Sequence, residues 1–251
     1  MGFRGLAAAA VAVGVLGASA ARAEPGLSGK VYDPYVRKGV TEVELRAGRL
    51  NGGELDGESA AVVEVEHGFT DRVSLAVLAE FERHAHETSK LDAIAVEGVA
   101  YLGQIPNTGI DVGAYLEYEQ RIHNESGVAE AKLLLARQFG PVRGLLNLIA
   151  ERPLTNKAGE DDTEFGYAAQ GTVEAGRGLN VGLQAFGELG TDKSLGGRQA
   201  HYLGPVANWE IHPAGAKGEI ELEAAYLLPL GVARHETDGQ VRLMLEYEAK
   251  F

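Results

Sequence analysis

Apolar and polar residues alternate along several stretches of this chain. The clearest alternation lies at the C-terminal end, where the odd positions are apolar and the even positions are mostly polar. The odd positions are Val241, Leu243, Leu245, Tyr247, Ala249 and Phe251. Residues 73–82, 112–119 and 219–228 alternate in the same way. Because successive side chains of a β-strand point to opposite faces, this period of two predicts strands that each have one apolar face.

Short turn signals recur along the chain at intervals of 34 to 38 residues. They centre on Pro34, Gly68, Gly103, Gly140, Gly176 and Pro213, and the chain ends one interval later. Longer and more polar segments lie between them, at residues 51–59, 83–90, 123–127, 152–164, 190–199 and 229–239. A repeat of this length indicates one supersecondary unit used several times. Six units of strand, loop, strand and short turn predict twelve strands.

An even number of antiparallel strands, joined alternately by short turns and long loops, is typical of outer-membrane barrels. We therefore predict an all-β fold, a single antiparallel up-and-down transmembrane β-barrel of about twelve strands. The last strand then pairs with residues 41–50 to close the barrel. Residues 128–139 fit a helix almost as well as a strand, since Ala131, Leu134 and Gln138 recur at helical spacing.

The N-terminus has the pattern of a cleaved secretory signal peptide. Arg4 precedes an apolar run at residues 6–18, and Ala21 and Ala23 give a small-x-small cleavage pattern before Glu24. The run is shorter than the roughly 20 residues that a spanning helix needs. We predict three parts: a signal peptide at residues 1–23, a periplasmic or lumenal segment at 24–39, and a barrel domain at 40–251. The chain has no cysteine, which excludes disulfides and thiolate metal sites.

Two motifs resemble those of a known class. The terminal Tyr247-Glu248-Ala249-Lys250-Phe251 resembles the C-terminal signal of Gram-negative outer-membrane β-barrel proteins, with Tyr247 and Phe251 as its aromatic residues. The stretch at residues 66–75, Glu-His-Gly-Phe-Thr-Asp-Arg-Val-Ser-Leu, resembles a turn of outer-membrane transport barrels, including a family named for phenol degradation. The resemblance implies an outer-membrane protein. With the short turns on the periplasmic side, twelve strands place both termini there. Its expected partners are outer-membrane lipid, lipopolysaccharide and the barrel assembly machinery, and a monomer is expected.

If the apolar faces contact lipid, the opposite faces line the lumen. The acidic residues predicted to face the lumen are Glu44, Glu64, Glu66, Glu80, Glu82, Glu117, Glu119, Glu174, Glu188, Glu221, Glu223, Glu246 and Glu248. The basic residues predicted there are Arg46, Lys132, Arg143 and Arg242. Rings of carboxylates favour cations in a pore. The first hypothesis is a channel or transport barrel that passes small solutes or cations. The alternative interpretation of the acidic positions is that Glu simply fills polar positions in an acidic protein.

The remaining chemistry in the sequence is sparse. Loss of Arg4 and Arg22 with the signal peptide takes the net charge from −13 to −15, which argues against a nucleic-acid partner. No Gly-x-Ser-x-Gly motif occurs, and we predict no catalytic residue, metal or cofactor. His84 and His86 share a face with Glu80 and Glu82, and such a set could bind a divalent metal ion. The simpler interpretation is that both histidines are solvated loop residues. The alternatives are a non-conducting structural or surface-binding barrel, an outer-membrane enzyme, and a soluble periplasmic β-protein.

Overall fold

The structure, a computed structural model, describes residues 26–122, 126–155, 162–197, 199–213 and 218–250. The predicted signal peptide and Phe251 lie outside these residues. Twelve long antiparallel strands form the wall of the molecule. They are β1 (Val40–Asn51), β2 (Ser59–Gly68), β3 (Val73–Arg83), β4 (Lys90–Ile105), β5 (Ile110–Arg121), β6 (Gly127–Phe139), β7 (Val142–Leu154), β8 (Glu164–Gly176), β9 (Leu179–Thr191), β11 (Ala200–Ile211), β12 (Gly218–Gly231) and β13 (Gly239–Lys250).

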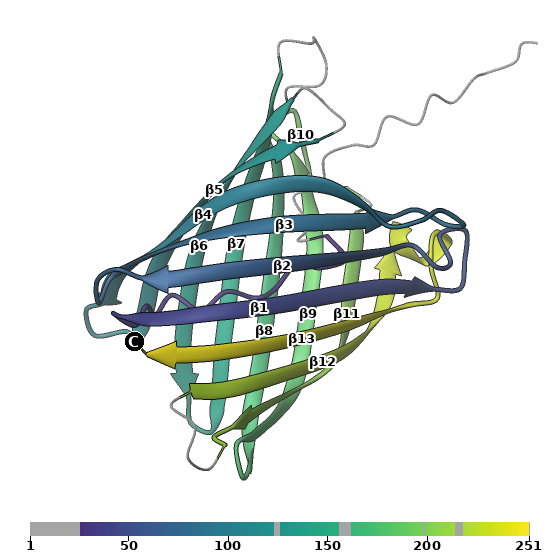
Figure 1. Ribbon diagram of the computed structural model, residues 1–251. Coiled ribbons are helices and arrows are strands. Elements are labelled where there is room, and N and C mark those ends of the chain that lie inside the picture. The colour runs from purple at the N-terminus through teal and green to yellow at the C-terminus, as the bar shows by residue number, and fades with distance from the viewer. Residues whose placement is uncertain (1–25, 123–125, 156–161, 198, 214–217, 251) are drawn as a thin grey trace, which may run out of the picture.

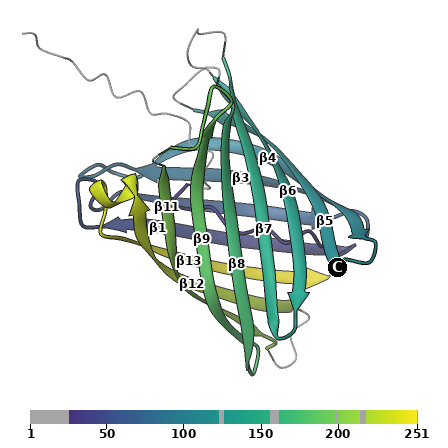
Figure 2. The same cartoon turned by 180° about the vertical axis from the view of Figure 1, so that it is seen from behind.

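The strands pair in chain order and the sheet closes on itself (Figures 1 and 2). β13 pairs with β1 along its whole length, from Val40 opposite Lys250 to Asn51 opposite Gly239. A further strand, β10 (Ser194–Leu195), pairs only with the end of β9 and is not part of the wall. The prediction of a closed twelve-stranded up-and-down barrel is confirmed. Residues 128–139 lie in β6, so the helical alternative for this stretch is wrong.

The connections alternate in length as the sequence predicts. Arg177 and Gly178 alone join β8 to β9, and their φ angles of 59° and 75° are those of a type I′ hairpin turn. We call the end of the barrel where β1 begins and β13 ends the proximal end, and the opposite end the distal end. All the short turns lie at the proximal end. The longer connections lie at the distal end, and one of them contains the 3₁₀ helix η1 (Val232–His235).

The two faces of the wall differ in the way that alternation requires. Outward apolar side chains are exposed, with exposed fractions of 58% for Val77 and 66% for Leu116. The inward neighbours Ala76 and Tyr115 are 4% and 1% exposed. An exposed belt of this kind suits a lipid environment, whereas a protein dissolved in water rarely exposes so large an apolar surface. Within the described ranges, no helix has the length and apolar character to cross a membrane.

Candidate functional site in the barrel lumen

The segment at residues 26–39 runs inside the barrel before it enters β1 (Figure 1). Three glycines on different strands let its backbone lie directly against the wall. A Cβ on Gly48 would clash with the carbonyl oxygen of Leu27, and one on Gly68 would clash with that of Arg37. A Cβ on Gly113 would lie 2.8 Å from the Cβ of Pro34. The wall is therefore shaped to receive this segment.

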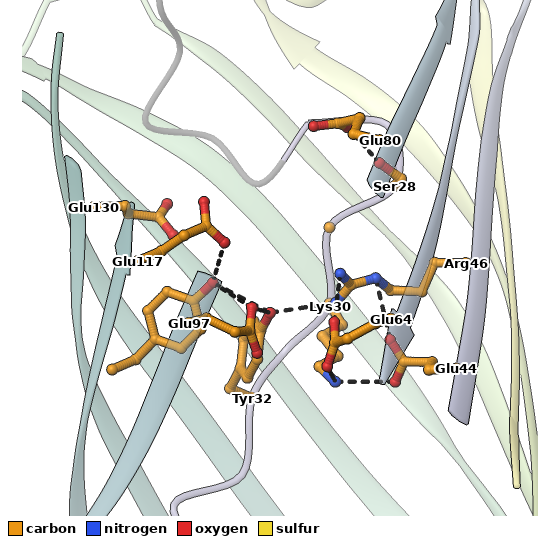
Figure 3. A network of polar contacts seen from close by, with 12 residues as sticks. Ser28, Lys30, Tyr32, Glu44, Arg46, Glu64, Glu80, Glu97, Glu117 and Glu130 are labelled. Carbon is orange, nitrogen blue, oxygen red and sulfur yellow. Dashed lines mark hydrogen bonds and ion pairs between the residues drawn. The ribbon is translucent and has the colours of Figure 1, made fainter. Parts of the chain in front are cut away.

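Lys30 anchors the middle of the segment to β1 and β2 (Figure 3). Its Nζ lies 2.9 Å from Glu44 Oε2 and 3.3 Å from Glu64 Oε1. Arg46 contacts the other oxygens of the same two carboxylates, at 3.1 Å and 2.9 Å. Burial by itself lowers the pKa of Lys30, but Glu44 and Glu64 outweigh it and raise the pKa well above its usual value. Two cations and two anions thus alternate in a buried square.

Tyr32 fixes the segment to the opposite wall. Its backbone N–H donates to Asn147 Oδ1 at 2.7 Å, and Asn147 Nδ2 donates back to the Tyr32 carbonyl oxygen at 2.9 Å. Its hydroxyl donates to Glu97 Oε2 at 3.1 Å, and Tyr115 donates to the same oxygen at 2.7 Å. The ammonium of Lys132 lies 4.4 Å from the centre of the Tyr32 ring. The segment is therefore held on both sides of the lumen (Figure 3).

The end of the segment is tied to the proximal mouth. Asp33 forms an ion pair with Arg143 of β7, and Arg37 forms one with Glu248 of β13. The Tyr35 hydroxyl donates to Asp111 Oδ2 at 2.8 Å. Burial, followed by this hydrogen bond to Asp111, raises the pKa of Tyr35 to about 12. These contacts direct the chain into β1.

The inward carboxylates form a row from strand to strand. Nine glutamates and one alanine occupy ten successive cross-strand positions from β12 around to β8. In order they are Glu219, Glu248, Glu42, Glu66, Ala76, Glu97, Glu117, Glu130, Glu151 and Glu164. Neighbouring strands lie about 4.8 Å apart, and barrel strands are tilted, so a row across them winds along the axis. It begins at the proximal mouth with Glu219 and reaches the distal ends of β7 and β8.

A cavity of about 520 Å³ opens between the segment and the wall from β7 around to β2, and Val99 of β4 also lines it. Every strand residue that lines it lies at or below the middle of its strand, on the proximal side. The acidic lining residues are Asp33, Glu42, Glu44, Glu66, Glu210, Glu219, Glu221, Glu223, Glu246 and Glu248. The basic ones are Lys30, Arg37 and Arg143, together with His212, and neutral hydrogen-bonding groups come from Gln170, Thr172, Asn180 and Asn208. Acidic groups clearly outnumber basic ones in this lining.

The distal half of the lumen is apolar on one side. Phe186, Leu227 and Ala233 are fully buried there in an apolar cluster, to which β7, β8, β9, β11, β12 and η1 contribute residues. Arg242 lies between part of this cluster and the segment, and Val31 of the segment packs against the cluster directly. Its guanidinium carbon lies 4.1 Å from the centre of the Phe186 ring, and its nitrogens donate to the carbonyl oxygens of Gly26 and Gly29. The lumen is thus polar and acidic at the proximal end and partly filled by apolar side chains further in.

Two sets of three carboxylates have oxygens within 4.8 Å of one another, as a metal site would require. They are Glu42 with Glu246 and Glu248, and Glu64 with Glu66 and Glu97. The chain's own cations contact both sets. Arg37 binds Glu248 and lies 3.8 Å from Glu42, while Lys30 and Arg46 bind Glu64.

The comparisons with known proteins show the fold. No family model matches the chain, and no curated protein matches it. Among solved structures, an outer-membrane channel from Pseudomonas putida F1 has a TM-score of 0.57 and 14% identity, with 86% of this chain and 97% of that chain covered. This chain has the fold of the outer-membrane channel barrels. The NanC porin has a TM-score of 0.55 and 10% identity over 83% of this chain and all of that chain. A KdgM porin, solved in complex with disordered oligogalacturonate, has a TM-score of 0.52 and 10% identity, with 84% and 99% covered.

The structure places most of the sequence-predicted lumenal residues in these networks. Those that line the cavity are Glu44, Glu66, Glu221, Glu223, Glu246, Glu248 and Arg143. Those bound elsewhere in the lumen are Glu64 and Arg46 beside Lys30, Glu80 with Ser28, Glu117 with Tyr115, Glu119 with Arg121, Lys132 with Glu130, and Arg242 with the segment. Glu82 and Glu188 lie toward the distal end, whereas Glu174 is exposed near the turn after β8. Tyr247 points outward with 42% of its surface exposed.

The sequence prediction left out Glu97 and Glu130. It gave the segment at residues 24–39 as either periplasmic or lumenal, and residues 26–39 run inside the barrel. Glu97 lies in a stretch whose alternation is diluted by Ala and Gly, and Glu130 lies in the stretch that also fits a helix. The sequence feature that could have identified Glu97 is its odd-numbered position in the strand. Ala93, Ala95 and Val99 lie on the same, inward side.

Proposed function

We propose that this chain is an outer-membrane channel that passes small cationic solutes through an acidic lumen. The observation that carries the proposal is the excess of carboxylates in the proximal cavity, continued by the glutamate row toward the distal end. Carboxylates that face one another across a lumen surrounded by low-dielectric wall attract and concentrate cations. The channel fold of the structural neighbours supports the proposal.

Conductance across a planar bilayer tests this directly. We expect discrete conductance steps, and in a potassium chloride gradient we expect a reversal potential of the sign that cation selectivity gives. Replacement of two cavity carboxylates, Glu221→Gln with Glu246→Gln, is expected to move the reversal potential toward zero. The matched variant Glu54→Gln with Asp71→Asn removes the same charge from exposed connections and is expected to leave it unchanged. A folded barrel that is silent or anion-selective would contradict the proposal.

A non-conducting structural or surface-binding barrel is the second candidate. The observation that favours it is the segment at residues 26–39, which crosses the lumen and is bound on both walls. Such a barrel acts through its distal loops, of which the predicted loop at residues 152–164 is the longest. This second candidate predicts that trimming the loop abolishes binding of a partner while the barrel still folds. It also predicts that the reconstituted protein shows no conductance.

We further propose that the chain is exported by its signal peptide, resides in the outer membrane as a monomer, and has its proximal end on the periplasmic side. In this arrangement the exposed apolar belt contacts lipid, and the distal loops lie beside lipopolysaccharide. Tyr247 and Phe251 would then be available to the barrel assembly machinery. Membrane fractionation, with labelling of loop residues on intact cells, tests location and orientation together.

A further inference from the structure

Five glutamates of the proximal cavity have no basic side chain at contact distance in the part of the chain that the structure describes. Among the described residues, no Lys, Arg or His nitrogen lies within 4.0 Å of the carboxylates of Glu66, Glu210, Glu221, Glu223 and Glu246. The other carboxylates of the lining each lie within 4.0 Å of a Lys, Arg or His nitrogen. Asp33 contacts Arg143, Glu44 contacts Lys30 and Arg46, Glu42 and Glu248 contact Arg37, and Glu219 contacts His212. The unpaired charges therefore lie together in one cavity.

Glu246 is the clearest of the five. It is 8% exposed, it lines the cavity, and its cross-strand neighbours are the carboxylates of Glu44 on one side and Glu221 on the other. A carboxylate buried to this degree among others is costly unless a cation compensates it. Within the described part of the chain, no Lys, Arg or His nitrogen lies within 4.0 Å of the Glu246 carboxyl group, whose own side-chain contact is a hydrogen bond with the carboxyl group of Glu44. A ligand that brings positive charge would remove this cost.

Lys30 shows what kind of cation this wall accepts. Its primary ammonium contacts Glu44 and Glu64 and lies 4.7 Å from the centre of the Tyr32 ring. Glu44 is the cross-strand neighbour of Glu246, so the occupied ammonium position adjoins the unoccupied carboxylates. An ammonium group of a solute would contact carboxylates of the same kind on the neighbouring strand.

The spacing of the unpaired carboxylates favours an elongated cation over a compact metal ion. Glu221 and Glu223 are two residues apart on β12, which corresponds to roughly 6.8 Å along the strand, and Glu246 lies across from Glu221 at about 4.8 Å. Ammonium groups joined by three or four carbons lie roughly 5 to 6 Å apart, given single bonds of about 1.5 Å. The two compact carboxylate sets are already contacted by Arg37, Lys30 and Arg46.

The rest of the lining suits the remainder of such a molecule. Gln170, Thr172 and Asn180 add neutral donors and acceptors to the lining, and the cavity volume of about 520 Å³ falls in the usual range for small-molecule sites. Asn208 donates to Glu221 at 3.2 Å and to Glu223 at 2.7 Å, and so orients both carboxylates.

We propose that the proximal cavity binds linear aliphatic polyamines, with ammonium groups on Glu221, Glu223 and Glu246 beside Lys30. This deepens the proposed cation channel by naming its substrate class, and it rests on that function for its physiological meaning. The selectivity follows from charge spacing: a molecule with two or three ammonium groups satisfies several carboxylates at once, which a monoamine cannot do.

Isothermal titration of the purified full-length barrel in detergent tests this with spermidine as the probe. We expect saturable binding, weaker by about tenfold for each ammonium group removed in the series to a diamine and a monoamine. Glu221→Gln with Glu246→Gln is expected to weaken spermidine binding about a hundredfold on the same basis. Glu54→Gln with Asp71→Asn is expected to leave it unchanged. Heat-dependent gel mobility shows whether each variant folds, and the amine series on the unaltered barrel needs no variant.

The opposing outcomes are distinct. Equal affinity for magnesium would indicate a compact divalent-cation site and overturn the proposal, as would equal loss in both double variants, which would indicate attraction by net charge alone. Absence of saturable binding also overturns it. Conductance separates the two proposals: a cation-selective barrel that does not bind spermidine contradicts only the polyamine site, and a silent barrel that binds it contradicts only the channel.

Discussion

Asn147 is the residue whose loss most directly tests whether the segment at residues 26–39 is docked in the lumen. Its side chain is fully buried, and it makes two hydrogen bonds of 2.7 Å and 2.9 Å with the backbone of Tyr32. In Asn147→Ala the buried N–H and C=O of Tyr32 both lose their partner. Each unsatisfied group costs about 1–3 kcal/mol, so docking should weaken by roughly 3 kcal/mol after water partly replaces the amide.

A single thiol provides the assay, because the chain contains no cysteine. Val31→Cys places the thiol on the segment, where Val31 packs against the apolar cluster around Phe186. A membrane-impermeant maleimide then reacts with the segment only when it opens. At 1.4 kcal/mol for each factor of ten, Asn147→Ala should raise the labelling rate on the order of a hundredfold.

Asn180→Ala is the matched variant. Asn180 lines the same lumen, and none of the described hydrogen bonds joins it to the segment. Its replacement should leave the labelling rate unchanged. The docking contacts would be refuted if Asn147→Ala did not accelerate labelling, if Asn180→Ala accelerated it as much, or if the thiol already reacted at the rate of a free cysteine in the parent.

Further predictions concern the same segment. Gly48→Ala introduces a Cβ that clashes with Leu27, so we expect faster labelling and less heat-resistant barrel on a gel, whereas Gly171→Ala, whose Cβ meets nothing closer than 3.9 Å, should have neither effect. A raised pKa on Lys30 means that its stabilisation is complete below the usual lysine value of about 10.4 and is lost only as pH rises through the higher folded value. Lys30→Met should therefore accelerate labelling by a constant factor across neutral and mildly alkaline pH; a factor that changed between about pH 6 and 9 would contradict this. Asp111→Asn should lower the Tyr35 pKa from about 12 toward 10, as ultraviolet titration measures against Tyr35→Phe; an unchanged titration would exclude the hydrogen bond as a cause.

The alternating pattern was sufficient to predict the strands and their two faces. Leu243 and Arg242 were separable into outward and inward positions because adjacent Cβ atoms in a strand point to opposite sides whatever the surroundings. The turn residues were sufficient to predict the number of strands. Gly140 and Gly178, for example, adopt positive φ angles that few other residues tolerate. These properties are local, and they survive in any fold that keeps the strands.

Periodicity was not sufficient where the inward side chains are small, or where the sequence pattern fits both the helical and the strand spacing. Residues 128–139 fitted a helix, and only pairing with β5 and β7 on both sides decided for a strand. The backbone hydrogen bonds that decide between the two states are made with residues distant in the chain, and a single segment does not contain them.

The sequence by itself determined that this is an acidic barrel with carboxylates on its inner face. Tertiary structure alone decided how those carboxylates are arranged and which of them are neutralised. The glutamate row depends on the register of nine strand pairs, including bulges such as the one between Tyr101 and Gly103, and a shift in any pair would break it. The contact between Tyr32 and Asn147 joins residues 115 positions apart. Charge pairing therefore follows from proximity across the lumen, which no local pattern encodes.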